Sequence, residues 1–160
     1  MAGPRLRMTT VVGMSLLVET CVIVFRLNGE DRLIDARPTV VFADDNLKVT
    51  EIACALLRAD YDVVKVAIDG EQAVRWICEL KPDFAVMDIS MPKMNGIAVA
   101  GELRRAGLRT RVIFVTVIED EDYMEAARSI GHGYVLKRRL SLDLLTALAS
   151  ARNNSFFCSQ

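Results

Sequence analysis

Five polar residues stand where short apolar runs of the sequence end: Asp44, Asp45, Asp88, Thr116 and Lys137. Carboxylates that lie close together repel one another, and a hard cation such as Mg²⁺ relieves this repulsion by taking oxygen ligands. An ionised carboxylate can also be the nucleophile in a phosphoryl transfer, where a nearby ammonium group stabilises the charge on the moving group. If the fold gathers these side chains, they predict a Mg²⁺-dependent phosphoryl-transfer site.

The elements that must gather these side chains are short strands that alternate with helices. The predicted strands are Val40–Ala43, Val63–Ile68, Phe84–Met87, Val112–Val115 and Gly133–Leu136. Four of these runs are almost wholly apolar, as in a parallel sheet covered on both faces, whereas Lys65 marks its run as an edge strand. We expect an α/β fold of the (βα)5 type, with a flavodoxin-like, doubly wound, five-stranded parallel sheet and helices on both faces.

Such a sheet brings the ends of distant strands together. Right-handed crossover connections place the carboxyl ends of all strands at one rim, beside the topological switch point, so the five polar residues should meet there. Taken singly they mean little, because an acid after a strand is more often a cap or a turn residue. Asp44 and Asp45 could cap the next helix, and Thr116 could bond to its own strand. Ser141 predicts the N-cap of the last helix, with Asp143 in its first turn.

Other candidate residues have simpler structural explanations. His132 lies between two glycines, which favours a turn residue over a ligand or a phosphohistidine. The basic run 137–139 has no interleaved aromatic residues and is typical of a solvated loop. Met87, Met91 and Met94 are expected to pack around the site rather than to bind a metal.

Two stretches of the sequence carry a family resemblance. Val40–Asp45 (VVFADD) resembles the strand and acidic pair of the response regulator receiver domain of two-component systems, and Met87–Gly96 (MDISMPKMNG) resembles its phosphoacceptor loop. The resemblance extends from about Thr39 to Ala151. It implies that Asp88 is the phosphorylated aspartate.

The same resemblance implies roles for further residues. Asp45 and Asp88 would bind Mg²⁺ directly, Asp44 would bind it through water, and the backbone carbonyl of Ser90 would be a further ligand. The ammonium of Lys137 would offset charge on the phosphoryl group. The Thr116 hydroxyl would turn to bind that group, which vacates space that the switch aromatic Tyr134 can fill.

The implied function is that of a signalling switch and not of an enzyme, apart from assisting its own phosphorylation and dephosphorylation. The phosphoryl donor would be a histidine kinase or a histidine phosphotransfer protein, the output a contact with a downstream protein target, and phosphorylation could bring about a homodimer. Val117 and Arg138 depart from the usual family residues, which supports the alternative of a phosphorylation-independent pseudo-receiver. A hydrolase with an aspartyl-phosphate intermediate is disfavoured, because Asp88-Ile89-Ser90 lacks the second aspartate of such enzymes.

Composition and charge restrict the choice of partners. Twenty basic and 21 acidic residues give a formal net charge of −1, so no chain-wide positive field attracts nucleic acid. The four cysteines are scattered without metal-binding spacing, which favours reduced thiols in a cytosolic protein. Residues 38–152 are the predicted receiver domain. Residues 153–160 are a tail too short for a helix-turn-helix, which favours a stand-alone receiver of the chemotaxis or sporulation type over a fragment of a DNA-binding transcriptional regulator.

Residues 1–37 do not follow the strand and helix rhythm. The apolar run Val11–Phe25 is shorter than the roughly 20 residues that a membrane-spanning helix needs, and it contains Glu19. The pair Asn28-Gly29 permits a hairpin. Three interpretations stay open: an irregular or hairpin-forming extension, a start codon assigned too far upstream, and, ranked last, a membrane anchor.

Overall fold

The computed structural model describes residues 8–10, 22–27, 30–35 and 37–160. The chain divides into two compact units, Met1–Arg37 and Pro38–Gln160, and each is described by itself. Among the described residues no helix is long and apolar enough to cross a membrane.

The first unit contains a three-stranded antiparallel sheet of β1 (Met8–Thr10), β2 (Val22–Leu27) and β3 (Glu30–Asp35). Strands β2 and β3 pair with Leu27 opposite Glu30, which is the pairing of a hairpin with a two-residue connection. The pair Asn28-Gly29 itself lies outside the described residues. So does most of the apolar run Val11–Phe25, of which only the last four residues are described, as part of β2.

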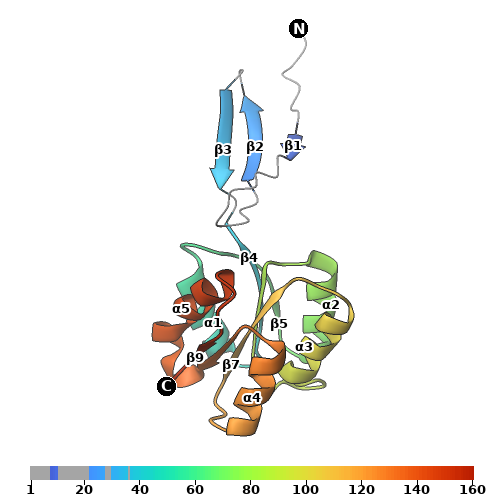
Figure 1. The fold of residues 1–160 in the computed structure, drawn as a ribbon, viewed down its shortest axis with the longest axis vertical. Coiled ribbons are helices and arrows are strands. Elements are labelled where there is room, and N and C mark those ends of the chain that lie inside the picture. The colour runs from blue at the N-terminus through green and yellow to red at the C-terminus, as the bar shows by residue number, and fades with distance from the viewer. Residues whose placement is uncertain (1–7, 11–21, 28–29, 36) are drawn as a thin grey trace. The chain divides into compact units, whose positions relative to one another are not determined.

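The second unit is built on a parallel sheet (Figure 1). The order of its strands is β5-β4-β6-β7-β8-β9. Its strands are β4 (Thr39–Ala43), β5 (Asp62–Ala67), β6 (Phe84–Met87), β7 (Arg111–Thr116), β8 (Gly133–Leu136) and β9 (Phe157–Cys158). The five predicted strands are confirmed, and β5 is an edge strand as Lys65 indicated. The short strand β9 was not predicted; it makes the sheet six-stranded and brings the tail into the domain.

Helices cover both faces of this sheet, as predicted for a doubly wound fold (Figure 1). They are α1 (Leu47–Leu57), α2 (Gly70–Leu80), α3 (Gly96–Arg105), α4 (Glu121–Ile130) and α5 (Leu140–Arg152). Helices α1 and α5 bury Leu57 and Leu144 in the core of one face, and α2, α3 and α4 bury Ile77, Val99 and Ala127 in the core of the other. The sheet is therefore apolar on both sides, which explains the unbroken apolar runs of its strands.

The strand order reverses at β4, which positions the site. Strand β5 lies on one side of β4, and β6, the next strand along the chain, lies on the other. The ends of β4 and β6 therefore flank the switch point, where open α/β sheets form their ligand crevices. Asp44 and Asp88 directly follow these two ends.

Four of the helices begin at side-chain caps, and the last one does not. The caps are Asn46, Asp69, Asn95 and Asp120. The predicted cap Ser141 is wrong, because a 3-10 turn (Lys137–Arg139) follows β8 directly and α5 already begins at Leu140. Asp143 lies in the first turn of α5 as expected, where it pairs with Arg139 at 2.8 Å.

His132 lies in the turn before β8, as predicted, and it also makes hydrogen bonds to the start of β7. Its ring Nδ1 accepts a hydrogen bond from Val112 N at 3.2 Å, and its own backbone N donates to Val112 O at 2.7 Å. Burial, together with the nearby Arg111, holds the pKa of His132 below its usual value. The neutral ring is the form that can accept this bond.

We expect this histidine to make the domain less stable in mild acid. Its folded-state pKa is lowered, so its contribution is full above the unfolded pKa of about 6.5 and is lost as the pH falls through the folded value. Urea unfolding at about pH 7.5 and about pH 5 should show a loss for the wild type that His132→Asn, which keeps an acceptor but does not titrate, shows to a smaller extent. An equal loss in both proteins would contradict this role.

Candidate functional site

The first part of the site is the loop after β4. Asp44 is fully buried; its Oδ1 accepts a hydrogen bond from Asn46 N at 2.8 Å, and its backbone N donates to Ala67 O. Asp45 is exposed. The cap of α1 is Asn46, which accepts hydrogen bonds from Lys48 N and Val49 N. The capping role that the sequence left open for the two acids thus falls to Asn46.

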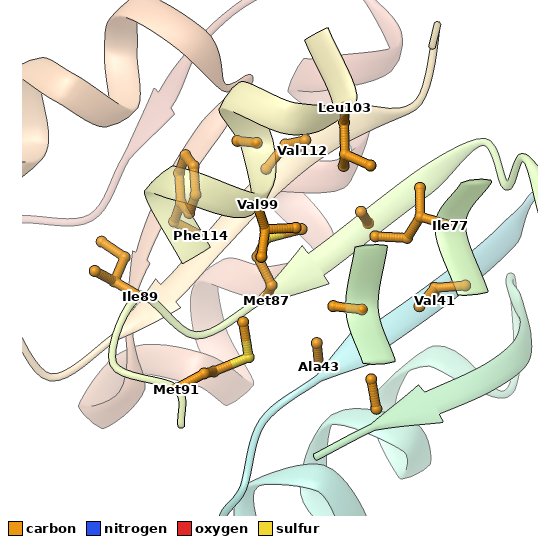
Figure 2. Packing of buried hydrophobic residues seen from close by; sticks show 14 of the residues in the cluster. Val41, Ala43, Ile77, Met87, Ile89, Met91, Val99, Leu103, Val112 and Phe114 are labelled. Carbon is orange, nitrogen blue, oxygen red and sulfur yellow. The ribbon is translucent and has the colours of Figure 1, made fainter. Parts of the chain in front are cut away.

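The second part is the loop after β6. Asp88 is 3% exposed; its backbone N donates to Ala43 O at 2.8 Å, which fixes it beside the end of β4. Its Oδ1 accepts a hydrogen bond from Ser90 N at 3.1 Å. Ile89 and Met91 anchor the loop by packing into the core beside Met87 (Figure 2). The packing role expected for these methionines is confirmed.

Gly96 sets how closely this loop approaches α3. Its backbone N donates to Ile89 O at 2.9 Å, and a Cβ at this position would lie 2.3 Å from Asp88 O. Such an approach is too short for any side chain, so only glycine fits without moving the backbone that carries Asp88. The same helix contains Gly101, where the nearest atom to an added Cβ is the end of the Arg105 side chain at 3.8 Å.

This pair of glycines gives a matched test. We expect Gly96→Ala to lower the free energy of unfolding by about 2 kcal/mol or more, because the loop or α3 must shift. Gly101→Ala should be neutral or should stabilise by about 0.5–1 kcal/mol, the gain of alanine over glycine inside a helix. Chemical denaturation of both variants measures the difference. Equal effects would show that the loop yields freely at Gly96.

Lys137 joins the two loops. Its Nζ lies 2.7 Å from Asp44 Oδ2 and 2.7 Å from Asp88 Oδ2, and it is largely buried. Burial disfavours its charged form, but the close contacts with the two carboxylates and their charges outweigh burial and raise the pKa of Lys137. Burial raises the pKa of Asp44, against the lowering effect of Lys137 and of Asn46 N. The ammonium is therefore fixed in its charged state between two acids.

The acids at this rim fit a hard cation. Asp44, Asp45 and Asp88 each offer one carboxylate oxygen, and these oxygens lie within 4.8 Å of one another. Asp44 Oδ2 is buried, and within the described part of the chain it accepts no aligned hydrogen bond, although Lys137 Nζ lies close to it. A cluster of oxygen donors with one exposed acid and one buried oxygen still able to accept suits Mg²⁺, which prefers such ligands and keeps several waters.

Thr116 and Tyr134 both contact one peptide segment next to the site. Thr116 Oγ1 accepts a hydrogen bond from Ile118 N at 3.2 Å, and Tyr134 Oη donates to Ile118 O at 2.6 Å. Both side chains are fully buried, and burial first, then nearby negative groups, raise the pKa of Tyr134 to about 12. The ring of Tyr134 is thus already buried in this structure, and its hydroxyl is protonated and donates a hydrogen bond to Ile118 O.

The two departures from the family pattern lie outside the cluster of acids. Val117 is 69% exposed, so its side chain is largely in contact with solvent. Arg138 is exposed and pairs with Glu119 at 2.8 Å, and this contact lowers the pKa of Glu119. The pair links the loop after β7 to the turn after β8. We expected neither this bridge nor the role of Ile118, because the sequence does not show which loop residues face each other.

The family model and the curated relatives that match this chain indicate the same protein family. The family model of the response regulator receiver domain matches residues 40–149. The uncharacterized transcriptional regulatory protein YvfU of Bacillus subtilis is 40% identical over 93 residues, which cover 58% of this chain and 46% of that protein. The oxygen regulatory protein NreC of Staphylococcus haemolyticus is 32% identical over 113 residues, which cover 68% of this chain and 52% of that protein.

Solved structures agree with the sequence comparisons. A DNA-binding response regulator of the LuxR family from Staphylococcus aureus superposes with a TM-score of 0.68 at 28% identity, over 72% of this chain and 99% of that chain. This chain spans about half the length of the curated relatives that it matches.

Proposed function

The chain belongs to the response regulator receiver domain family, and on that premise we propose that Asp88 accepts a phosphoryl group in a Mg²⁺-dependent reaction that switches protein contacts in two-component signalling. The observation that supports this most directly is the position of Lys137, whose Nζ lies 2.7 Å from both Asp44 and Asp88. An ammonium between two carboxylates at a switch point is suited to a group that brings further negative charge. Receiver domains are signalling domains and not enzymes, as expected.

In this proposal the cation ligands are the carboxylates of Asp45 and Asp88, Asp44 through water, and the backbone carbonyl of Ser90. Mg²⁺ would supply positive charge for the oxygens of the phosphoryl group. Asp88 Oδ2 is the oxygen nearest Lys137, while Oδ1 accepts from Ser90 N. Lys137 can follow the incoming group without leaving Asp44, because the same ammonium already contacts both acids.

The direct test is to incubate the chain with a small phosphodonor and Mg²⁺ and to measure its intact mass. One added phosphoryl group is expected, and none without Mg²⁺. An unmodified protein under both conditions would favour the pseudo-receiver, and rapid turnover of the donor without a modified chain would favour a hydrolase. The natural donor that we propose is a histidine kinase or a histidine phosphotransfer protein.

Asp45→Ala is expected to remove Mg²⁺ binding while the domain stays folded. Asp45 is exposed, so its loss removes a ligand but little packing, and it lowers the repulsion among the acids. Isothermal titration should show at least a tenfold loss of Mg²⁺ affinity. Asp60→Ala, another exposed acid in a loop, is the control and should keep it. Unchanged affinity in Asp45→Ala would exclude this residue from the metal site.

We further propose that the signal leaves the site through Ile118. To bind a phosphoryl oxygen, the Thr116 hydroxyl must turn away from Ile118 N, and Ile118 O holds the Tyr134 hydroxyl. Because Tyr134 is already inside, the expected change is a shift of the loop 117–120 and of the ring it holds. The affected surface lies around α4 and β8.

A second candidate function has its own support. YvfU is a transcriptional regulatory protein, the Staphylococcus aureus structure is a DNA-binding regulator, and this chain spans about half the length of its curated relatives. The same switch could therefore control a DNA-binding part of a longer protein instead of acting as a stand-alone receiver. Cloning the genomic region with its flanking sequence would distinguish the two: an in-frame helix-turn-helix supports the second, and its absence supports the stand-alone switch.

A further inference from the structure

The C-terminal residues form an added strand at the edge of the sheet. Helix α5 ends in a turn in which Asn154 takes a positive φ of 55° and Ser155 N donates to Ser150 O at 2.9 Å. This turn directs residues 155–159 along β8, where Tyr134 pairs with Cys158 in parallel register. Ser159 N donates to Tyr134 O at 2.8 Å. The edge of β8 is thereby covered by the chain itself.

Side chains of this segment alternate between the two faces of the sheet, as in a regular strand. The guanidinium carbon of Arg128 lies 4.6 Å from the centre of the Phe156 ring, and Cys158 Sγ lies 3.8 Å from Met124 Sδ. Because Arg128 and Met124 belong to α4, Phe156 and Cys158 both contact this helix. Phe157 packs into the core of the opposite face. The segment therefore contacts α4 on one face of the sheet and the core on the other face.

Ser159 fastens the segment next to the proposed switch. Its Oγ accepts a hydrogen bond from Leu136 N at 3.1 Å and donates to Asp143 Oδ2 at 2.6 Å, and the residue is 6% exposed. Leu136 directly precedes Lys137, which contacts Asp44 and Asp88. Ser159 thus binds the backbone of β8 twice, through its own backbone N to Tyr134 O and through its Oγ to Leu136 N.

We propose that the edge of β8 between α4 and α5 is a strand-binding site which residues 155–159 occupy in cis, and that phosphoryl transfer to Asp88 loosens this occupancy. The second half rests on the proposed function. With the strand docked, the Tyr134 hydroxyl donates to Ile118 O and Ile118 N donates to the Thr116 hydroxyl, and in this proposal the docked strand favours that arrangement. Turning Thr116 to a phosphoryl group breaks the latter bond, so docking and phosphorylation oppose each other, and each must weaken the other by the same factor.

The released edge would accept an extended segment of the same chemistry. Unpaired backbone groups of β8 would offer main-chain hydrogen bonds, and the places of Phe156, Phe157 and Cys158 would take apolar side chains from both sides of the strand. The occupant to which the proposal commits is the segment of this chain.

The first experiment measures amide hydrogen exchange in the full chain. Ser159→Ala should speed exchange at the Ser159 position and at Leu136 about tenfold, the loss of roughly 1.4 kcal/mol from local stability. It should also raise the rate of phosphorylation by a small donor several-fold. Ser155→Ala, an exposed serine of the same segment, is the matched control and should change neither. No effect of Ser159→Ala would overturn the docking of the segment.

The second experiment adds beryllium fluoride and Mg²⁺ to the wild type as a phosphoryl mimic. Shifts of the Asp88 and Ser90 amides report whether the mimic binds, and faster exchange at Ser159 reports whether the strand loosens. Shifts at Asp88 with unchanged exchange at Ser159 would overturn the coupling alone. Missing shifts at Asp88 would count against the proposed function, and with it against the coupling.

The third experiment needs no phosphoryl group. A peptide of residues 153–160 should bind in trans to the full chain carrying Phe157→Ala, whose own strand is weakened, and should restore slow exchange at Leu136. The same peptide with both phenylalanines replaced by alanine should not. Equal behaviour of the two peptides would overturn the strand-binding site.

Discussion

Asp88→Asn is expected to abolish phosphorylation while the domain stays folded. Asparagine keeps the shape of the side chain and one oxygen that can accept from Ser90 N, but it lacks the ionised oxygen that attacks phosphorus. Lys137 keeps its partner Asp44 at 2.7 Å, so its charge is not left unpaired. The loss of one of three mutually repelling acids offsets part of the lost ion pair. Intact mass after incubation with a small phosphodonor and Mg²⁺ should show no added group.

The control for this variant is Asp83→Asn. Asp83 precedes β6, at the opposite end of the strand that Asp88 follows, and it accepts hydrogen bonds from Thr39. The same chemical change there should lower stability to some degree but leave phosphorylation intact. Undiminished phosphorylation of Asp88→Asn would overturn the assignment of the acceptor. Loss in both variants would point to a general effect of the substitution on folding.

Much of the fold could be predicted because its signals are local. Runs such as Phe84–Met87 are apolar without alternation, which is typical of a strand covered on both faces, and the structure has this strand with the predicted bounds. The rule that the carboxyl ends of parallel strands lie at one rim also predicts, from the sequence alone, that Asp44, Asp88 and Lys137 lie close together. Their contacts at 2.7 Å agree with that expectation.

Features that depend on contacts between distant segments were missed. Strand β9 has two residues, too short for a periodic signal, and it forms only because the turn at Asn154 directs it to the edge of β8. The adjacent pair Phe156-Phe157 after a polar turn was the available sign that this tail is not solvated. The cap at Ser141 failed for a related reason: the turn after β8 continues into α5 without a break.

The sequence predicts which acidic residues lie at the site, but it does not predict the hydrogen bonds and ion pairs that join the loops around them. The spacing of apolar runs places a residue at a strand end, but it does not show which loop atoms meet across the rim. Ile118 joins Thr116 to Tyr134 through its backbone alone, so its side-chain type gives no sign of this role. The ion pair between Glu119 and Arg138 likewise depends on how the loop after β7 and the turn after β8 lie against each other, which the sequence does not show.

Thr116→Ala is expected to separate accepting a phosphoryl group from responding to it. The variant keeps Asp88, both other acids and Lys137, so one phosphoryl group should still be added, even if more slowly. It loses the hydroxyl that accepts from Ile118 N and that we propose turns to the phosphoryl group. A modification shifts a conformational equilibrium only by its different interaction with the two states. The amide shifts that beryllium fluoride causes at Tyr134 and in α4 should therefore shrink to a small fraction of their wild-type size.

Thr110→Ala is the matched control for this test. Thr110 is also buried, and its hydroxyl donates to Pro82 O at 2.8 Å, at the far end of β7 from Thr116. Its loss should cost about 1–2 kcal/mol of stability without reducing the shifts at Tyr134. Tyr134→Phe provides the converse measurement, because it removes the hydroxyl from Ile118 O and leaves Thr116 in place. If the signal passes through the Ile118 peptide, the double variant should lose no more response than Thr116→Ala alone; wild-type shifts in Thr116→Ala would refute this route and leave the acceptor assignment of Asp88 untouched.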